Sequence, residues 1–283
     1  MWRSSAFPWT YLESRIAGNR TRDLFDSLRT YVMFIGQPRS GTSLLGSILN
    51  AHRNMCVAQE LNALKYVRRG YDRQQLFWLL LKRDACFEKS GRRWTGYDYK
   101  VPNRWQDRSE QLEVIGDKKA GLSTDQLQRY PEMWARLQRL VQVPMRIIHL
   151  VRDPFNVITT VQLRRRISLK KSVEIYFRRC ETNWQLMQQH PDMIRTLRLE
   201  DLIDQPERQL LDLCEFLDVT PDIDYLRDSA SILFSKPRHS KATSPWPRHV
   251  IDDVQRRLQA FPFLHGYTYA SADHQDQPAR RAA

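Results

Sequence analysis

The stretch Tyr31-Val-Met-Phe-Ile-Gly-Gln-Pro-Arg-Ser-Gly-Thr-Ser-Leu-Leu-Gly-Ser-Ile-Leu-Asn50 decides the fold. Residues 31–35 are apolar and partly β-branched, which predicts a buried strand. Glycine and proline over 36–41 predict a tight loop, and apolar residues at helical spacing resume over 42–49. Such an order points backbone N–H groups and the positive end of a helix at one spot. The stretch therefore predicts a phosphate-binding loop.

This loop departs from the Walker A pattern G-x-x-x-x-G-K-[ST] at one position. Gly36 and Gly41 fit the pattern, but Thr42 stands in place of the lysine, and Ser43 follows it. Because the lysine reaches the β- and γ-phosphates of a nucleotide, its loss argues against metal-assisted phosphoryl transfer. Arg39 brings a cation into the loop instead. On the loop alone, a strand-turn-helix without a ligand is the alternative.

Length and composition fit a single α/β domain. The 283 residues are 41% hydrophobic, which is enough for one substantial core. The chain has 45 basic and 32 acidic residues, so its net charge of +13 predicts attraction to anions without saying which. The four cysteines and seven histidines are scattered without metal-ligand spacing, so no metal site is expected. No apolar run reaches membrane-spanning length and no signal peptide is visible, so we expect a soluble protein, cytoplasmic if bacterial.

The loop motif Pro38-Arg-Ser-Gly-Thr-Ser-Leu-Leu45 resembles the 5′-phosphosulfate loop of sulfotransferases that use 3′-phosphoadenosine 5′-phosphosulfate (PAPS). The resemblance is to the bacterial type, with a catalytic frame similar to the tyrosylprotein branch. It implies a P-loop NTPase-like parallel sheet with the loop strand central and helices on both faces. It also implies transfer of a sulfuryl group to an acceptor hydroxyl. The implied donor-binding residues of the loop are Pro38, Arg39, Ser40, Gly41, Thr42 and Ser43.

A second motif, Arg152-Asp-Pro154, follows a predicted strand over residues 145–151. It resembles the family's 3′-phosphate site. The resemblance implies that Arg152 makes a bidentate contact with that phosphate, that Thr160 donates its hydroxyl, and that Arg164 contacts the donor one helical turn further on. Alone, the motif would indicate a helix start with a structural ion pair. Its position after the phosphate loop favours the 3′-phosphate site.

Glu60 is the candidate general base. In the tyrosylprotein branch a glutamate at the corresponding place after the R-S-G-T loop takes the proton of the acceptor, and Glu60 matches it in distance from Arg39. A helix-capping or surface glutamate is the alternative. In the same frame Arg39 stabilises negative charge around the transferring group.

Lys118 and Lys119 follow an apolar run over 112–115 at a predicted strand end. Relatives carry a lysine in a comparable motif, usually followed by Thr-Pro or Asp-Pro, whereas here Lys119 and Ala120 follow Lys118. The choice between the two lysines stays open, and we prefer Lys118. Its ammonium would stabilise charge on the oxygen that bridges phosphate and sulfate. Two exposed lysines at a turn are the alternative.

The segment 63–115 is rich in aromatic and basic residues around a predicted helix over 73–87. It predicts either an acceptor-binding insertion or the packing of a lid, since tryptophan and arginine serve both. Ser240 and Lys241 lie in a basic segment that, in relatives, closes over the donor; a solvated loop is the alternative. Leu199 stands where relatives have a tyrosine beside the nucleobase.

We therefore expect a lead-in over 1–30, a sulfotransferase domain over 31–270, and a disordered tail over 271–283. One further helix is expected over 123–141. The acceptor stays open among carbohydrate, lipid, phenol, peptidyl tyrosine and natural product, and no nucleic-acid partner is expected. A nucleotide-dependent small-molecule kinase and a non-catalytic module that binds anions or glycans are the alternative functions.

Overall fold

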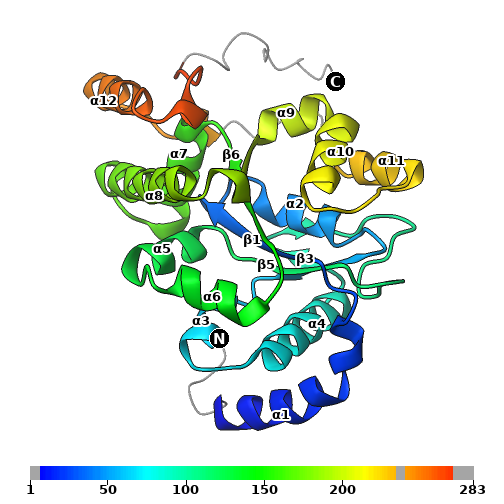
Figure 1. Ribbon diagram of the computed structural model, residues 1–283. Helices are drawn as coiled ribbons and strands as arrows, with labels where there is room; N and C mark the ends of the chain where they lie inside the picture. The colour runs from blue at the N-terminus through cyan, green and yellow to red at the C-terminus, as the bar shows by residue number, and fades with distance from the viewer. Residues whose placement is uncertain (1–6, 234–239, 270–283) are drawn as a thin grey trace.

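A five-stranded parallel sheet forms the centre of the computed structural model, which describes residues 7–233 and 240–269 (Figure 1). The strand order is β2-β5-β1-β6-β7, so the strand that leads into the loop is central. The strands are β1 (Thr30–Gly36), β2 (Met55–Gln59), β5 (Val114–Lys118), β6 (Met145–Val151) and β7 (Ile194–Arg198). A separate antiparallel pair consists of β3 (Arg93–Trp94) and β4 (Tyr97–Asp98). The predicted fold class is confirmed.

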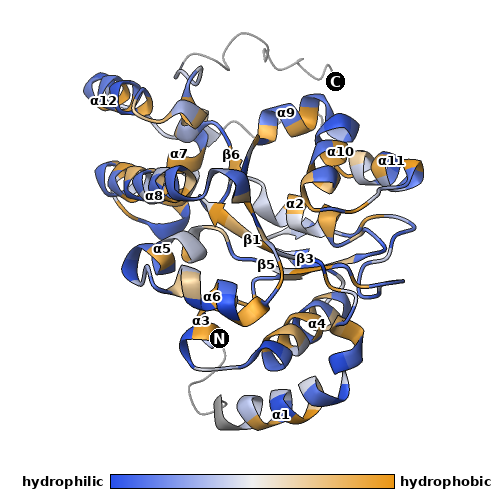
Figure 2. Ribbon diagram, viewed as in Figure 1, coloured by the Kyte–Doolittle hydropathy of each residue, from blue (hydrophilic) through white to orange (hydrophobic). Residues whose placement is uncertain are grey.

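The central strand β1 is buried along its whole length. Tyr31, Met33 and Ile35 belong to one core cluster, while Val32 and Phe34 belong to another. Because successive side chains of a strand point to opposite faces, these two clusters lie on the two sides of the sheet. Figure 2 shows β1 as a hydrophobic arrow between the helix layers, as expected of a parallel sheet covered on both faces.

Helices cover both faces of the sheet (Figure 1). The cluster around Tyr31 includes residues of α3 (Ala63–Arg68), α4 (Arg73–Lys89), α5 (Gly121–Arg129) and α6 (Met133–Val141). The cluster around Val32 includes residues of α2 (Thr42–Leu49), α9 (Leu199–Asp204), α10 (Pro206–Phe216) and α11 (Ile223–Ser231). A third cluster joins α7 (Pro154–Arg165), α8 (Leu169–Gln189) and α12 (Arg248–Leu258). The helix α1 (Phe7–Arg20) packs on α4, and the 3-10 turns are η2 (Arg22–Phe25), η3 (Pro191–Met193), η4 (Ser240–Thr243) and η5 (Pro262–Leu264).

One predicted helix is wrong in extent. The helix expected over 123–141 is divided into α5 and α6, with Tyr130 and Pro131 between them. Pro131 has no N–H to donate and its ring clashes with the preceding turn, which ends α5. The predicted tail over 271–283 and residues 235–239 of the basic segment lie outside the described residues. Within the described residues, no helix is long and apolar enough to cross a membrane.

All five parallel strands end at the same edge of the sheet. The phosphate loop follows β1, Glu60 follows β2, and Lys118 ends β5. Arg152 follows β6 and Leu199 follows β7. Parallel pairing therefore gathers motifs that are far apart in the sequence, and ligands of open α/β sheets bind at this edge.

Candidate active site

The phosphate loop has a left-handed backbone at three residues. The φ angles of Gly36, Arg39 and Gly41 are 117°, 75° and 90°. Gly41 is the N-cap of α2 and, having no side chain, makes no capping hydrogen bond to the first N–H groups of that helix. The buried hydroxyl of Ser40 has no hydrogen-bond partner among the described residues. The left-handed turn at Arg39, a helix start that its N-cap residue does not cap, and the unpartnered Ser40 hydroxyl fit a tetrahedral anion such as phosphate or sulfate.

Helices α5 and α8 fix the start of this loop. The N–H of Gly36 donates to Thr124 Oγ1 at 3.0 Å, and Gln37 Nε2 donates to a main-chain carbonyl of α8 at 2.8 Å. Arg179 of α8 forms a bidentate pair with Asp125 of α5 at 2.7 and 2.8 Å. Sequence reasoning missed these supports, because their partners lie 54 to 139 residues apart in the sequence.

Lys118 connects the candidate base to the phosphate loop. Its Nζ donates to Glu60 Oε1 at 2.6 Å and to Ser43 Oγ at 2.8 Å. Lys119 Nζ also donates to Glu60, through the other carboxylate oxygen Oε2. Both lysines left open by the sequence thus contact Glu60, but Lys118 alone of the two also bonds to Ser43 of the loop within the described residues.

Burial and charge shift the pKa values of this group. Burial raises the pKa of the Glu60 carboxyl, but the ammonium groups of Lys118 and Lys119 outweigh it, so the net shift is downward. Burial lowers the pKa of the Lys118 ammonium, and Glu60 opposes this only in part. Gly46 of α2 leaves room for the buried lysine, because a Cβ there would lie 2.9 Å from Lys118 Cγ.

Asp117 holds the turn that presents Glu60. Its Oδ1 accepts from the N–H of Leu61 at 2.9 Å and its Oδ2 from the N–H of Ala63 at 2.7 Å. Glu60 and Asn62 have left-handed φ angles of 61° and 70°, which these bonds help to maintain. Asp117 is fully buried, and burial raises the pKa of its carboxyl to about 6.

Arg152 and the start of α7 reach the same loop. Arg152 Nη1 donates to the main-chain carbonyl of Arg39 at 3.1 Å, and burial lowers the pKa of its guanidinium. Asp153 caps α7 by accepting from two N–H groups of the first turn. The hydroxyl of Thr160 donates to the carbonyl of Asn156 at 2.7 Å. Arg164 is exposed on the same helix, one turn beyond Thr160.

Ser240 and Lys241 form part of η4, which packs on α7. Ser240 is half-buried, but Lys241 is fully buried, unlike the solvated loop considered as an alternative. The Lys241 ammonium donates to the carbonyl of Tyr269 at 2.5 Å and lies 3.4 Å from Asp153 Oδ2. A donor contact by Lys241 would have to compete with these two partners, and it stays a prediction.

Two chain segments close to α7 complete this side of the site. Glu200 accepts from the N–H of Asp153 at 2.9 Å and from the hydroxyl of Tyr267 at 2.7 Å. Leu199 lies against the loop, because a Cβ built on Gly41 would come 2.8 Å from Leu199 Cδ1. It is an apolar neighbour of the loop in place of the tyrosine of relatives.

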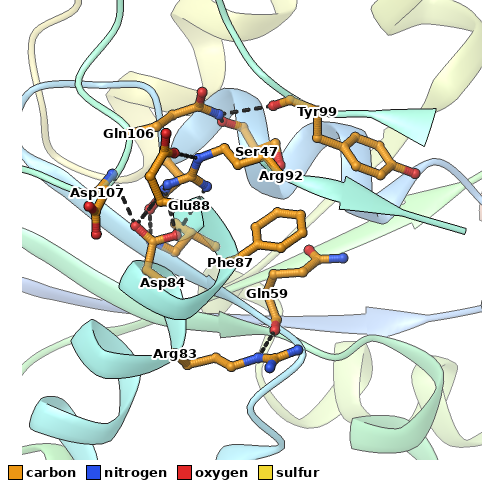
Figure 3. A network of polar contacts seen from close by, with 12 residues as sticks. Ser47, Gln59, Arg83, Asp84, Phe87, Glu88, Arg92, Tyr99, Gln106 and Asp107 are labelled. Carbon is orange, nitrogen blue, oxygen red and sulfur yellow. Dashed lines mark hydrogen bonds and ion pairs between the residues drawn. The ribbon is translucent and has the colours of Figure 1, made fainter. Parts of the chain in front are cut away.

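The segment after α4 borders the loop and is held by a buried network (Figure 3). Arg92 pairs with Asp84 at 3.1 Å and with Glu88 at 2.5 Å, so its guanidinium ties this segment to α4. Beyond it, Thr95 Oγ1 lies 3.5 Å from Arg39 Nη1. The hydroxyl of Tyr99 interacts with Thr95 and with Ser43 of the loop. Part of the predicted insertion therefore lies at the site.

No group of three or more histidine, cysteine, aspartate or glutamate residues that could hold a metal ion is found in residues 7–233 and 240–269.

Comparison with known proteins gives one family. A model described as the sulfotransferase family matches residues 32–223, more than half of the chain. A sulfotransferase domain from the curacin biosynthetic pathway matches with a TM-score of 0.52 at 18% identity, over 83% of this chain and 98% of that one. A sulfotransferase domain from the Synechococcus PCC 7002 olefin synthase gives 0.49 at 18% identity, over 79% and 83%. No curated protein matches the chain.

Proposed function

This chain belongs to the sulfotransferase family and is an enzyme of sulfuryl transfer, and from this premise we propose that its donor is PAPS and its acceptor a hydroxyl compound. The 5′-phosphosulfate would lie on the loop formed by Pro38, Arg39, Ser40, Gly41, Thr42 and Ser43. The 3′-phosphate would be held by Arg152, with Thr160, Arg164, Ser240 and Lys241 as further candidates. The acceptor class stays open between glycans, lipids and natural products.

The residues present fit a donor with two separate anionic ends. The loop offers uncapped helix N–H groups and the buried Ser40 hydroxyl. Arg152 brings a buried guanidinium to the other side of the same loop, where it bonds to the carbonyl of Arg39. A planar guanidinium suits bidentate recognition of phosphate. One cofactor that spans both positions explains why the two motifs end adjacent strands.

PAPS supplies an activated sulfuryl group on a phosphate leaving group. Glu60 would take the proton of the acceptor hydroxyl while the acceptor oxygen forms its bond to sulfur. Lys118 and Arg39 would stabilise the negative charge that collects on the bridging oxygen as its bond to sulfur is broken. The products are the sulfated acceptor and adenosine 3′,5′-bisphosphate. The single observation that carries this proposal is the Lys118 ammonium that joins Glu60 to Ser43.

Calorimetric binding of adenosine 3′,5′-bisphosphate without magnesium tests the donor. We expect binding by the wild-type protein and a loss of at least about tenfold in Arg152→Ala, since the variant loses a charge-assisted contact. Arg165→Ala, on the exposed end of α7, is the matched control and should bind as the wild type does. Failure of the wild type to bind would overturn the proposal, and binding of ATP and magnesium instead would favour the kinase.

The two alternative functions have less support. A nucleotide-dependent kinase lacks the loop lysine, since Thr42 occupies that position. A non-catalytic binding module would not need the contacts of Glu60 with Lys118 and Lys119. Magnesium-dependent turnover of a nucleoside triphosphate would favour the kinase. Glycan binding that survives Glu60→Ala, without sulfuryl transfer by the wild type, would favour the binding module.

A further inference from the structure

A pocket of about 290 Å³ opens beside the candidate base, on the side of Glu60 that faces α3 and α4. Its walls come from the turn after β2, from α3 and α4, and from Lys119 and Leu122 beyond β5. Because Glu60 is part of the wall, a ligand in this pocket would lie beside the candidate base. The volume is close to the lower range of small-molecule sites, which suits a compact acceptor.

The charged side chains of the pocket are mostly cationic. Lys65, Lys82, Arg83 and Lys119 line it, and among the described residues Glu60 is the one carboxylate in its wall. Lys119 is bonded to Glu60, and Lys82 is bonded to a glutamate outside the pocket. Among the described residues, the wall therefore carries more positive than negative charge.

Arg83 has guanidinium N–H groups that donate to no other residue within 7–233 and 240–269. Its Nε donates to the main-chain carbonyl of Gln59 at 2.6 Å, as Figure 3 shows. Because Gln59 directly precedes Glu60, this bond anchors the guanidinium close to the candidate base. In the described part of the chain it forms no ion pair with a carboxylate. Its remaining N–H groups can therefore bind an anionic group, and a planar guanidinium suits carboxylate or phosphate.

Apolar side chains complete the pocket. Leu61 and Tyr66 line it from the turn after β2 and from α3, and Leu79 lines it from α4. Such a mixture of apolar wall and few polar groups is typical of sites for small organic ligands. A fully polar ligand such as inorganic phosphate would leave this apolar surface without a partner.

We propose that this pocket binds the acceptor, and that the acceptor is a small hydroxyl compound with an apolar body and an anionic group held by Arg83. This inference rests on the proposed function, because it takes Glu60 as the base. The anionic group is a carboxylate or a phosphate, which share the same chemistry toward a guanidinium. Arg83 selects the acceptor and takes no part in the transfer itself.

Cys86 gives a readout of the pocket that is independent of turnover. It lines the pocket and is exposed, whereas Cys56, Cys180 and Cys214 are buried. The rate at which neutral N-ethylmaleimide modifies Cys86 should fall when a ligand fills the pocket. Loss of the modification in Cys86→Ser would show that the thiol followed is that of Cys86.

Three probes of one shape test the charge selection. They are 4-hydroxyphenylacetate, 4-hydroxybenzylphosphonate and the neutral 4-hydroxyphenylacetamide. We expect at least one anionic probe to protect Cys86 at a concentration about tenfold lower than the amide, as a charge-assisted hydrogen bond predicts. The anion that protects better identifies the group. Arg83→Gln should abolish the preference, and Lys89→Gln, exposed on the same helix outside the pocket, should keep it.

Equal protection by the amide and the anions, or no protection by any probe, overturns the inference. Binding of adenosine 3′,5′-bisphosphate to the same preparations distinguishes a failure of the pocket inference from a failure of the donor proposal. If the bisphosphate binds and Cys86 is not protected, the donor proposal stands and the pocket inference falls. If the anionic probe protects Cys86 and the bisphosphate does not bind, the pocket is an anion-selective site and the donor proposal falls.

Discussion

The Nζ of Lys118 lies 2.6 Å from Glu60 Oε1 and, at the same time, 2.8 Å from Ser43 Oγ. One buried cation is therefore shared between the candidate base and the phosphate loop. The pairing keeps the pKa of Glu60 below its ordinary value although burial opposes this, so the carboxylate is ionised at neutral pH. An ionised carboxylate is the form that can accept a proton from a hydroxyl.

The pairing predicts energetic coupling between Glu60 and Lys118. Lys118→Met and Glu60→Gln should each lower the free energy of unfolding. Lys118→Met leaves Glu60 with Lys119 as its one cation of the pair, and Glu60→Gln leaves the buried Lys118 ammonium without its carboxylate. The double variant should be less destabilised than the sum of the two single variants by about 1–2 kcal/mol. Urea unfolding of the four proteins at neutral pH measures this coupling.

A surface ion pair provides the control for this comparison of single and double variants. Arg257 and Glu174 lie 2.7 Å apart, with 27% and 60% of their side chains exposed. Their coupling should be below about 1 kcal/mol, since solvent screens such pairs. Additive effects of Glu60→Gln and Lys118→Met would contradict the prediction.

Asp117 should make stability depend on pH. Its pKa of about 6 in the folded protein lies above the ordinary aspartate value, so between roughly pH 4 and 6 the folded state binds more protons than the unfolded state. The free energy of unfolding contributed by this group therefore falls as the pH rises through that range, by about 3 kcal/mol for a shift of two units. Asp117→Asn removes the titration.

Urea unfolding of the wild type and Asp117→Asn at several pH values between 4 and 7 tests this. As the pH rises, the unfolding free energy of the wild type should fall relative to that of Asp117→Asn. Parallel pH profiles would show that the buried carboxyl does not titrate in this range.

Much of the site follows from strand ends that are visible in the sequence. The apolar runs before the loop, before Lys118 and before Arg152 predict strands, and parallel pairing then brings their ends to one edge. This logic, together with the resemblance at Glu60 and at the lysine, is enough to expect both near the loop. It could not choose between Lys118 and Lys119, because both side chains reach Glu60 from a strand end.

Other contacts depend on packing that local sequence does not encode. Arg92 and Arg93 are neighbours of the same type, yet Arg92 is 1% exposed and Arg93 is exposed. Asp84, eight residues earlier on α4, decides the difference by binding Arg92. The sequence places Lys241 in a basic loop, but in the structure its ammonium is buried beside Asp153, the residue that caps α7.

Gly46→Ala should disturb Lys118. In an ordinary helix interior this substitution stabilises by up to about 1 kcal/mol. Here a Cβ would lie 2.9 Å from Lys118 Cγ and 3.1 Å from its Cβ, so the lysine would have to leave its place between α2 and Glu60. We expect no gain in stability and a fall of about tenfold or more in sulfuryl transfer, since small displacements of catalytic groups are costly.

The Lys118→Gly background separates steric conflict from helix propensity, because it removes both the Cβ and the Cγ that a Cβ on Gly46 would approach. In that background Gly46→Ala should raise the free energy of unfolding. A gain in stability of the same size in both backgrounds would mean that Gly46 does not make room for Lys118.

The network around Asp84 predicts unequal effects for two adjacent arginines (Figure 3). Arg92→Met leaves the Asp84 carboxylate buried without its cation and should lower the free energy of unfolding by about 3 kcal/mol. Arg93→Met is the matched control, because its side chain is 81% exposed and lies 4.0 Å from Asp98, so its effect should be below about 0.5 kcal/mol. Asp84 also accepts from Asn50 at the end of α2, so Arg92→Met should make the segment after α4 easier to cleave with protease in the folded protein. Similar unfolding free energies and cleavage rates for the two variants would show that this network does not hold the segment against the phosphate-loop helix.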